Sequence, residues 1–319
     1  MEEELGPAAT PALSRHGLGL TGPDPGSAGR AVAVRDDLLA WGARNRRDLP
    51  WRRTRDPWLV MVSEVMLQQT QVPRVLEPYQ RFVRRFPTPR RCAGAGPGEV
   101  VRAWAGLGYN RRALNLHRAA EAIVAEHGGR VPGDLAALLR LPGVGDYTAR
   151  AILSLAFGHD TGVVDTNAAR VLARFVAGRA VGGRREAQSL ADALVPPGRS
   201  WELNQSVFDL GATVCTRRRP RCASCSLAHR CAWAERGWPE PDPAEGTAGA
   251  SRGQPAFAGS DRQGRGRLVD ALRNGPVAPR DLAPITGWHG EPERVRRIVD
   301  GLVAEKMVRR GPGGRLQLA

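Results

Sequence analysis

The sequence predicts an all-α fold that carries a small winged-helix-like module at its C-terminal end. Apolar residues recur at three- and four-residue spacing from Ala31 to about Trp238, which is the period of helices packed on a core. No convincing alternation of apolar and polar residues, the pattern of half-buried strands, interrupts this region. After a low-complexity stretch, residues 265–319 read as three helices followed by a strand–turn–strand.

The 319-residue chain is too long for one small core and divides into four parts. Residues 1–30 are rich in Gly, Pro, Ala and Ser without periodicity, so we expect a disordered tail. Residues 31–238 form the expected helical core, residues 239–264 a flexible linker, and residues 265–319 the winged-helix-like module. Helical spacing in the core is clearest in Arg35–Trp41, Pro73–Phe86, Leu135–Leu139, Thr148–Phe157, Ala168–Val176 and Glu186–Leu194.

The balance of charge predicts a polyanionic partner. The formal net charge is +15, almost all of it from arginine, and Lys306 is the only lysine of the sequence. Basic side chains that neutralise phosphates release condensed counterions, which favours nucleic acid, although a solvated basic surface is the alternative. No apolar stretch of about 18 residues indicates a membrane span, and MEEELGPAAT lacks the basic start of a signal peptide. We therefore expect a cytoplasmic protein with reduced thiols.

Four of the five cysteines fall close together with the spacing C-x6-C-x2-C-x5-C: Cys215, Cys222, Cys225 and Cys231. Thiolates in one compact loop converge on a soft metal centre. A single C-x2-C pair with two wider gaps favours a [4Fe–4S] cubane over a structural zinc site, which stays the alternative. Between the first two ligands, Arg217, Arg218 and Arg219 would be held rigidly and would suit phosphate contacts, unless they are simply solvated.

The segment LPGVGDYTA (residues 141–149) predicts a hairpin between two helices. Gly143 and Gly145 permit a tight turn that leaves backbone N–H groups open to a DNA phosphate beside a helix N-terminus, although an ordinary helix turn is the alternative. Asp165, in VVDTNAARVLARF, is explained by a helix N-cap alone. An N-cap carboxylate at a domain junction is also able to face a DNA cleft.

Several separate motifs resemble one enzyme family. SEVMLQQTQV (residues 63–72), LPW (49–51), GLGY (106–109) and VDTN (164–167) join the hairpin and the cysteine loop. Over about residues 33–233 the chain resembles the MutY family of adenine DNA glycosylases, within the endonuclease III superfamily of helix–hairpin–helix glycosylases. The resemblance implies a two-lobed fold. Residues 58–164 would form a six-helix lobe with the hairpin, and residues 31–57 with 165–238 the lobe of the cluster.

The same resemblance implies a role for two carboxyl groups. Neutral adenine is a poor leaving group, so Glu64 would protonate its N7 from a partly desolvated pocket. Asp165 would stabilise the positive charge that develops on the sugar. Tyr147 and Asn167 would hold both acids and the sugar. The implied adenine pocket is lined by Arg47, Trp51, Arg52 and Gln205, and the implied wedges that enter the base stack are Gln69 and Tyr109.

The residue inventory argues against strand cleavage. Bifunctional relatives form a Schiff base through a lysine that follows L-P-G-V-G-x, and here that position holds Tyr147. Lys306 lies far along the chain, in the C-terminal module. We therefore predict a monofunctional glycosylase that leaves an abasic site.

The resemblance predicts double-stranded DNA with an A:8-oxoguanine or A:G mispair as the partner of a monomeric, bacterial, nucleoid-associated enzyme. Typical members read 8-oxoguanine with a NUDIX-like domain, for which we expect no room in this chain. The preferred base opposite adenine is therefore left open. A sliding clamp or another repair protein as a partner is left open as well. One rival is a thymine glycosylase for T:G mismatches, but thymine has no N7 for Glu64 to protonate. Another is an iron–sulfur redox-sensing regulator that binds DNA, which leaves Glu64, Asp165 and Tyr147 unexplained.

Overall fold

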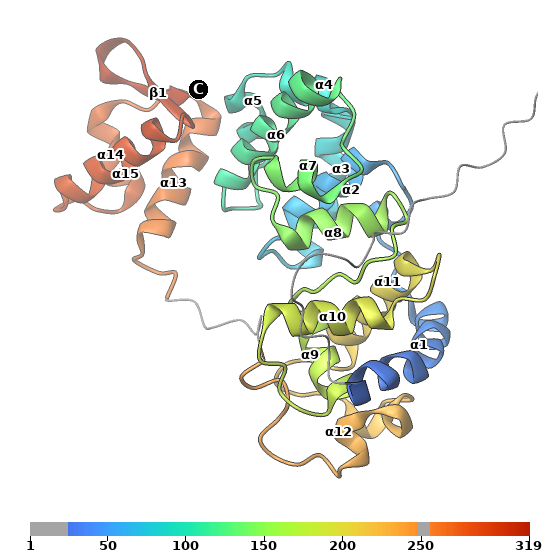
Figure 1. Cartoon of the computed structure of the whole chain (residues 1–319). Helices are drawn as coiled ribbons and strands as arrows, with labels where there is room; N and C mark the ends of the chain where they lie inside the picture. The colour runs from blue at the N-terminus through green and yellow to red at the C-terminus, as the bar shows by residue number, and fades with distance from the viewer. Residues whose placement is uncertain (1–24, 248–255) are drawn as a thin grey trace, which may run out of the picture.

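The computed structural model describes residues 25–247 and 256–319, and these are mostly helical, which confirms the predicted fold class (Figure 1). They form two helical lobes and a C-terminal module (residues 256–319). In the part of the chain that is described, no helix is both long and apolar enough to cross a membrane.

The hairpin lobe (residues 57–155) is built from helices whose first turns are set by proline and by side-chain caps. Pro57, Pro89 and Pro97 occupy the first helical position, where a missing N–H costs nothing. The lobe has seven helices rather than the six expected, because a short helix, α4, separates α3 from α5. In chain order they are α2 (Pro57–Leu67), α3 (Val72–Arg85), α4 (Pro89–Ala93), α5 (Pro97–Ala103), α6 (Arg111–His127), α7 (Leu135–Arg140) and α8 (Asp146–Leu155).

The cluster lobe combines the first described helix with residues 166–235. The described residues form two buried apolar clusters, and the second of them, here called the second core, lies in this lobe. It joins Leu38 of the first helix to Phe175 and Leu190, which are all at most 3% exposed. Its helices are α1 (Pro25–Asn45), α9 (Thr166–Val171), which continues as the π-helical turn η2 (Leu172–Ala177), α10 (Arg184–Leu194), α11 (Ser200–Thr213) and α12 (Ala232–Glu235). Because α1 packs against α10 and α11, the start of the described chain closes this lobe.

Three predicted boundaries differ from the structure, and one of them is the end of the linker, because the first helix of the C-terminal module begins at Asp261, inside the predicted linker of residues 239–264. Helix α1 begins at Pro25, so residues 25–30 are helical, while the rest of the predicted tail, 1–24, lies outside the described residues. Residues 239–247 of the predicted linker pack on the cluster lobe. There Arg174 donates to Asp242, and Thr247 is only 4% exposed. The linker was inferred from composition, which does not register an ion pair between residues that are far apart in sequence.

The C-terminal module has the predicted three helices and terminal hairpin: α13 (Asp261–Asn274), α14 (Leu282–Thr286), α15 (Pro292–Ala304), β1 (Val308–Arg310) and β2 (Leu316–Leu318). The strands are antiparallel, with Val308 opposite Leu318, and a bridge from Val277 to Leu316 extends the pairing. The predicted hairpin and helix order are thus confirmed.

The module is not the separate unit that the sequence suggested. Its apolar residues belong to the same buried cluster as those of the hairpin lobe. At the contact, the N–H of Gly98 in α5 donates to the carbonyl of Ala319 at 2.6 Å. A Cβ at Gly98 would lie 2.3 Å from that oxygen, so only glycine permits this approach. A module this small buries too little apolar surface alone and completes its core against its neighbour.

Candidate active site

A cleft of about 1350 Å³ runs between the two lobes and reaches the C-terminal module. Its walls bring together residues that are far apart in the sequence. All four proposed catalytic residues (Glu64, Tyr147, Asp165 and Asn167) and all four proposed pocket residues (Arg47, Trp51, Arg52 and Gln205) line it. Gln69, Tyr109 and Gly145 line it as well.

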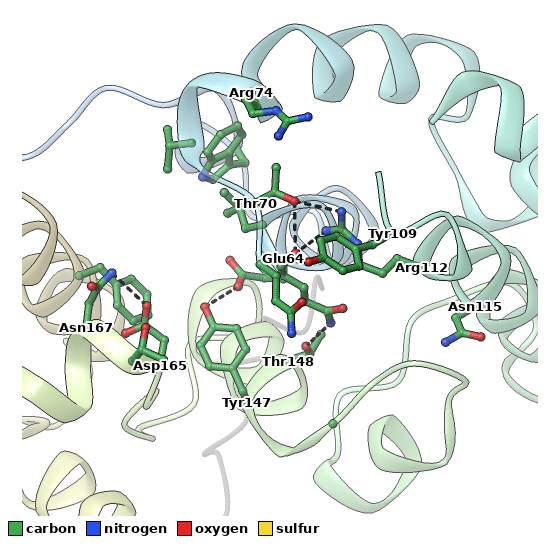
Figure 2. A pocket seen from close by; sticks show the side chains of 18 of the residues that line it. Glu64, Thr70, Arg74, Tyr109, Arg112, Asn115, Tyr147, Thr148, Asp165 and Asn167 are labelled. Carbon is green, nitrogen blue, oxygen red and sulfur yellow. Dashed lines mark hydrogen bonds between the residues drawn. The ribbon is translucent and has the colours of Figure 1, made fainter. Parts of the chain in front are cut away.

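Glu64 lies near the end of α2, on the helix face turned toward the cleft, and is 3% exposed. The hydroxyl of Tyr147, in the first turn of α8, donates to Glu64 Oε2 at 2.8 Å (Figure 2). Burial, helped by the negative charge of Asp165, raises the pKa of Glu64 to about 7, although the hydrogen bond from Tyr147 and the charge of Arg52 oppose the shift. A carboxyl group with this pKa still carries a proton near neutral pH, as a general acid must.

Asp165 is the N-cap of α9 and also faces the cleft, so its structural and its proposed chemical role coexist. Its Oδ1 accepts the N–H of Ala168 at 2.6 Å, and the side-chain amide of Asn167 lies 3.4 Å from Oδ2. Burial raises the pKa of Asp165, whereas the N–H groups of Ala168 and Asn167 and the charge of Arg170 act in the opposite direction by stabilising the carboxylate.

A chain of hydrogen bonds connects Asp165 to the start of the cysteine loop. Asn167 Oδ1 accepts from Arg170 Nη2 at 2.8 Å, and Arg170 Nε donates to the carbonyl of Cys215 at 2.7 Å. Arg170 Nη2 also donates to the carbonyl of Gly211 at 2.6 Å. These bonds link the Asp165 carboxylate, through Asn167 and Arg170, to the first residue of the loop. Sequence reasoning missed Arg170, although it lies one helical turn after Asn167.

Asp209 is a second residue that sequence reasoning missed. It is fully buried in α11, and it accepts hydrogen bonds from the side chains of Arg47 at 2.6 Å and Arg52 at 2.7 and 2.9 Å. These bonds lower the pKa of Asp209, although burial of the carboxyl group acts in the opposite direction. The acid neutralises and orients the two arginines of the proposed adenine pocket. Its position, one helical turn after Gln205, was the available signal.

The two proposed wedge residues stand on adjoining loops in strained backbone. Gln69 has φ +54° and Tyr109 has φ +46°, values that are uncommon outside glycine. Arg112 ties the loops together: it donates to the carbonyls of Val65, Met66, Gln68, Leu107 and Gly108 and to the hydroxyl of Thr70. One half-buried guanidinium thus joins the two strained loops, and sequence reasoning also missed it.

The hairpin forms as expected between α7 and α8. Gly143 adopts φ +80°, and a Cβ there would lie 2.8 Å from the side chain of Asn115. Gly145 is extended and caps the ten-residue helix α8. Gly145 lines the cleft, whereas Gly143 lies outside its lining residues.

The four clustered cysteines lie on one side of the cluster lobe, each of them half-buried. Cys215, Cys225 and Cys231 pack against the second core. Arg174, which is 1% exposed, lies 3.6 Å from Cys215 Sγ, and its carbonyl is 3.4 Å from Cys231 Sγ. Burial raises the pKa of Cys222, Cys225 and Cys231, and the neighbouring thiols add to the shift.

The chemistry of the donor set suits a soft metal centre, because all four side chains are thiols of one loop. No three His, Cys, Asp or Glu side chains of the described residues have the spacing of a single-ion site. The arginines of the loop, Arg217, Arg218 and Arg219, are exposed and lie outside the lining of the cleft.

Residues 62–197 match the HhH-GPD superfamily of base excision DNA repair proteins. An adenine DNA glycosylase of Mycobacterium tuberculosis is 43% identical over 305 residues, which cover 93% of this chain and 97% of that protein. A thymine/uracil-DNA glycosylase of Methanothermobacter thermautotrophicus is 33% identical over 211 residues, covering 65% of this chain and 95% of that protein. The solved structure of a thermostable thymine-DNA glycosylase superposes with a TM-score of 0.59 at 31% identity, covering 65% of this chain and 98% of that one.

Proposed function

Because this chain belongs to the adenine DNA glycosylases of the HhH-GPD superfamily, we propose that it removes adenine paired with 8-oxoguanine or guanine from double-stranded DNA. The reaction is hydrolysis of the N-glycosidic bond in base excision repair. The observation that carries the proposal is Glu64: a buried carboxyl group with a pKa raised to about 7, in one cleft with a second carboxyl group, Asp165.

Glu64 acts first, as the general acid. It transfers its proton to N7 of the extruded adenine, and the C1′–N9 bond then breaks with its electron pair going to the base. Adenine leaves as a neutral molecule that carries the added proton. General acids of this kind contribute about 10²- to 10⁴-fold to a rate. Tyr147 holds the Glu64 carboxyl through its 2.8 Å hydrogen bond.

Asp165 stabilises the cation left on the sugar. Its carboxylate is fixed by the N–H of Ala168 and by Asn167, so it does not need to reorganise as charge develops at C1′. A water molecule then adds to C1′, and its proton passes to the ionised Glu64, which restores the acid. The product is an abasic site.

Strand cleavage by a Schiff base is not expected. The only lysine of the sequence, Lys306, is exposed and lies outside the lining of the cleft, although its neighbour Glu305 lines it. Tyr147 occupies the position where the resemblance places the lysine of bifunctional relatives, and a phenol forms no imine.

Cys215, Cys222, Cys225 and Cys231 would hold a [4Fe–4S] cluster. When bound, the cluster would cross-link the loop, a structural contribution. Arg174 beside Cys215 would offset part of the thiolate charge, which suits an anionic group at this half-buried place. Through Arg170, the ordered loop then supports Asn167 and Asp165.

The relative from Methanothermobacter and the superposed structure give thymine release some support as a second candidate. Glu64 favours adenine, because thymine has no N7 to protonate.

The test is a panel of duplexes that contain A:8-oxoguanine, A:G, T:G or thymine glycol. We expect free adenine from the first two duplexes, and strand breaks there only after alkali. Release of thymine in preference to adenine would establish the second candidate, and breaks without alkali would overturn the monofunctional mechanism.

A further inference from the structure

The cleft does not end at the catalytic groups, and one of its walls belongs to the C-terminal module. The module contributes Phe257, Arg262, Arg265, Gly266 and Glu305 to the lining. The superfamily match covers residues 62–197 and leaves this wall without an assigned role. The inference below rests on the proposed function, since it concerns how the same DNA substrate is held.

The wall is fixed to the loop that carries the proposed wedge Tyr109. Arg273 of α13 donates to the side-chain oxygen of Asn110 at 2.7 Å and to the carbonyl of Val101 at 3.2 Å. Asn110 is 7% exposed, so this bond is sheltered from solvent. Arg118 of α6 donates to the carbonyl of Glu305 at 2.7 Å. The module therefore presents its side chains at a defined place beside Tyr109.

The chemistry of this wall suits a DNA strand. Arg262 Nη1 lies 3.5 Å from the hydroxyl of Tyr109, and Phe257 is 59% exposed. Among the described residues of this wall, Glu305 is the one acid; it pairs with both Arg265 and Arg111, and two arginines of the module, Arg262 and Arg265, line the cleft beside it. Guanidinium groups recognise phosphates, and exposed aromatic rings pack on sugars and bases.

The longest helix of the module is less suited to this task. On α15, Arg294 and Arg297 pair with Asp261, and Arg296 pairs with Glu293. These pairs neutralise the helix locally. The cleft wall, and not α15, is therefore the face of the module that fits DNA.

We propose that the C-terminal module binds the DNA strand opposite the extruded adenine, through Arg262 on a backbone phosphate and Phe257 against the sugar. A wedge that fills the gap left by an extruded base lies next to the partner strand. Arg262 contacts the hydroxyl end of Tyr109 and so lies near that strand, whereas the adenine strand is turned toward Glu64 and Asp165.

The test compares Arg262→Ala, Arg262→Lys and Arg267→Ala in the full chain. Arg267 is a matched control, because it is an exposed arginine of the same helix outside the cleft lining. The probe is a duplex with 2′-fluoro-2′-deoxyadenosine opposite 8-oxoguanine, since the fluorine disfavours the sugar cation and keeps the base in place. We expect about tenfold weaker binding for Arg262→Ala and a salt slope reduced by about one. The lysine variant should keep the slope.

Hydroxyl-radical footprinting of the same complexes assigns the strand. We expect Arg262→Ala to lose protection on the 8-oxoguanine strand and to keep it on the adenine strand. Loss on the adenine strand, or equal affinities and slopes for Arg262→Ala and Arg267→Ala, would overturn the inference. A wild-type chain that binds this duplex but releases no adenine from the same duplex made with ordinary 2′-deoxyadenosine would instead defeat the proposed function, so the two failures are distinguishable.

Discussion

Replacing Tyr147 with phenylalanine should move the pH profile of base release to higher pH. The Tyr147 hydroxyl donates to Glu64 Oε2 at 2.8 Å and favours the ionised carboxylate. Only the protonated form of Glu64 acts as the acid. The wild-type rate should therefore fall tenfold per pH unit above about pH 7, and protonation of the Asp165 carboxylate should lower it again at more acidic pH.

The size of the shift follows from the lost hydrogen bond. A bond to a charged group contributes about 1.5–3 kcal/mol, and one pKa unit corresponds to about 1.4 kcal/mol. Without the phenol, burial and the charge of Asp165 act on Glu64 with less opposition. The alkaline midpoint should rise from about 7 by about one to two units.

The assay is adenine release in single turnover with saturating protein, measured across the pH range on an A:8-oxoguanine duplex. Tyr79→Phe is the control: Tyr79 is a buried tyrosine that packs on Trp51 and lies outside the cleft lining. Its midpoint should equal that of the wild type. A midpoint for Tyr147→Phe that stays in place or moves to lower pH would refute this reasoning, whatever the change in maximal rate.

Three further substitutions test other parts of the site. Glu64→Gln should lower base release by at least about 10²-fold while DNA affinity, read by anisotropy, is kept; equal loss of both would mean that Glu64 is only structural. Asp209→Asn should leave two arginines uncompensated, lower the pKa of Glu64 and move the alkaline midpoint to lower pH. Thermal unfolding should show that the free energy of unfolding falls by about 3–5 kcal/mol. An unchanged alkaline midpoint of the pH profile would contradict the electrostatic role of Asp209. Cys222→Ser should lower bound iron and visible absorbance in the purified protein, whereas Cys92→Ser, outside the loop, should leave both unchanged.

Local sequence was enough to predict the residues whose role depends on their immediate neighbours. The hairpin glycines and the Asp165 cap are set by a few adjacent residues, and the structure has both as expected. Helical periodicity likewise predicted the helices of the core, and a strand–turn–strand pattern predicted the terminal β-hairpin.

The residues that were missed act across long distances in sequence. Asp209 meets Arg47 from 162 residues away, and Arg112 reaches the carbonyl of Val65 from 47 residues away. A local sequence pattern around Asp209 or Arg112 does not show which residues they will contact. The docking of the C-terminal module was missed for the same reason, since it depends on Gly98 and Asn110, which carry no sign of their partners in the sequence.

Protonation of the base at N7 is tested most directly with a substrate that lacks this nitrogen. A duplex with 7-deaza-2′-deoxyadenosine opposite 8-oxoguanine keeps the shape of adenine but replaces N7 with carbon. We predict that the wild-type protein binds this duplex about as tightly as the adenine duplex and releases no base from it. Release at a rate close to that of adenine would contradict the account.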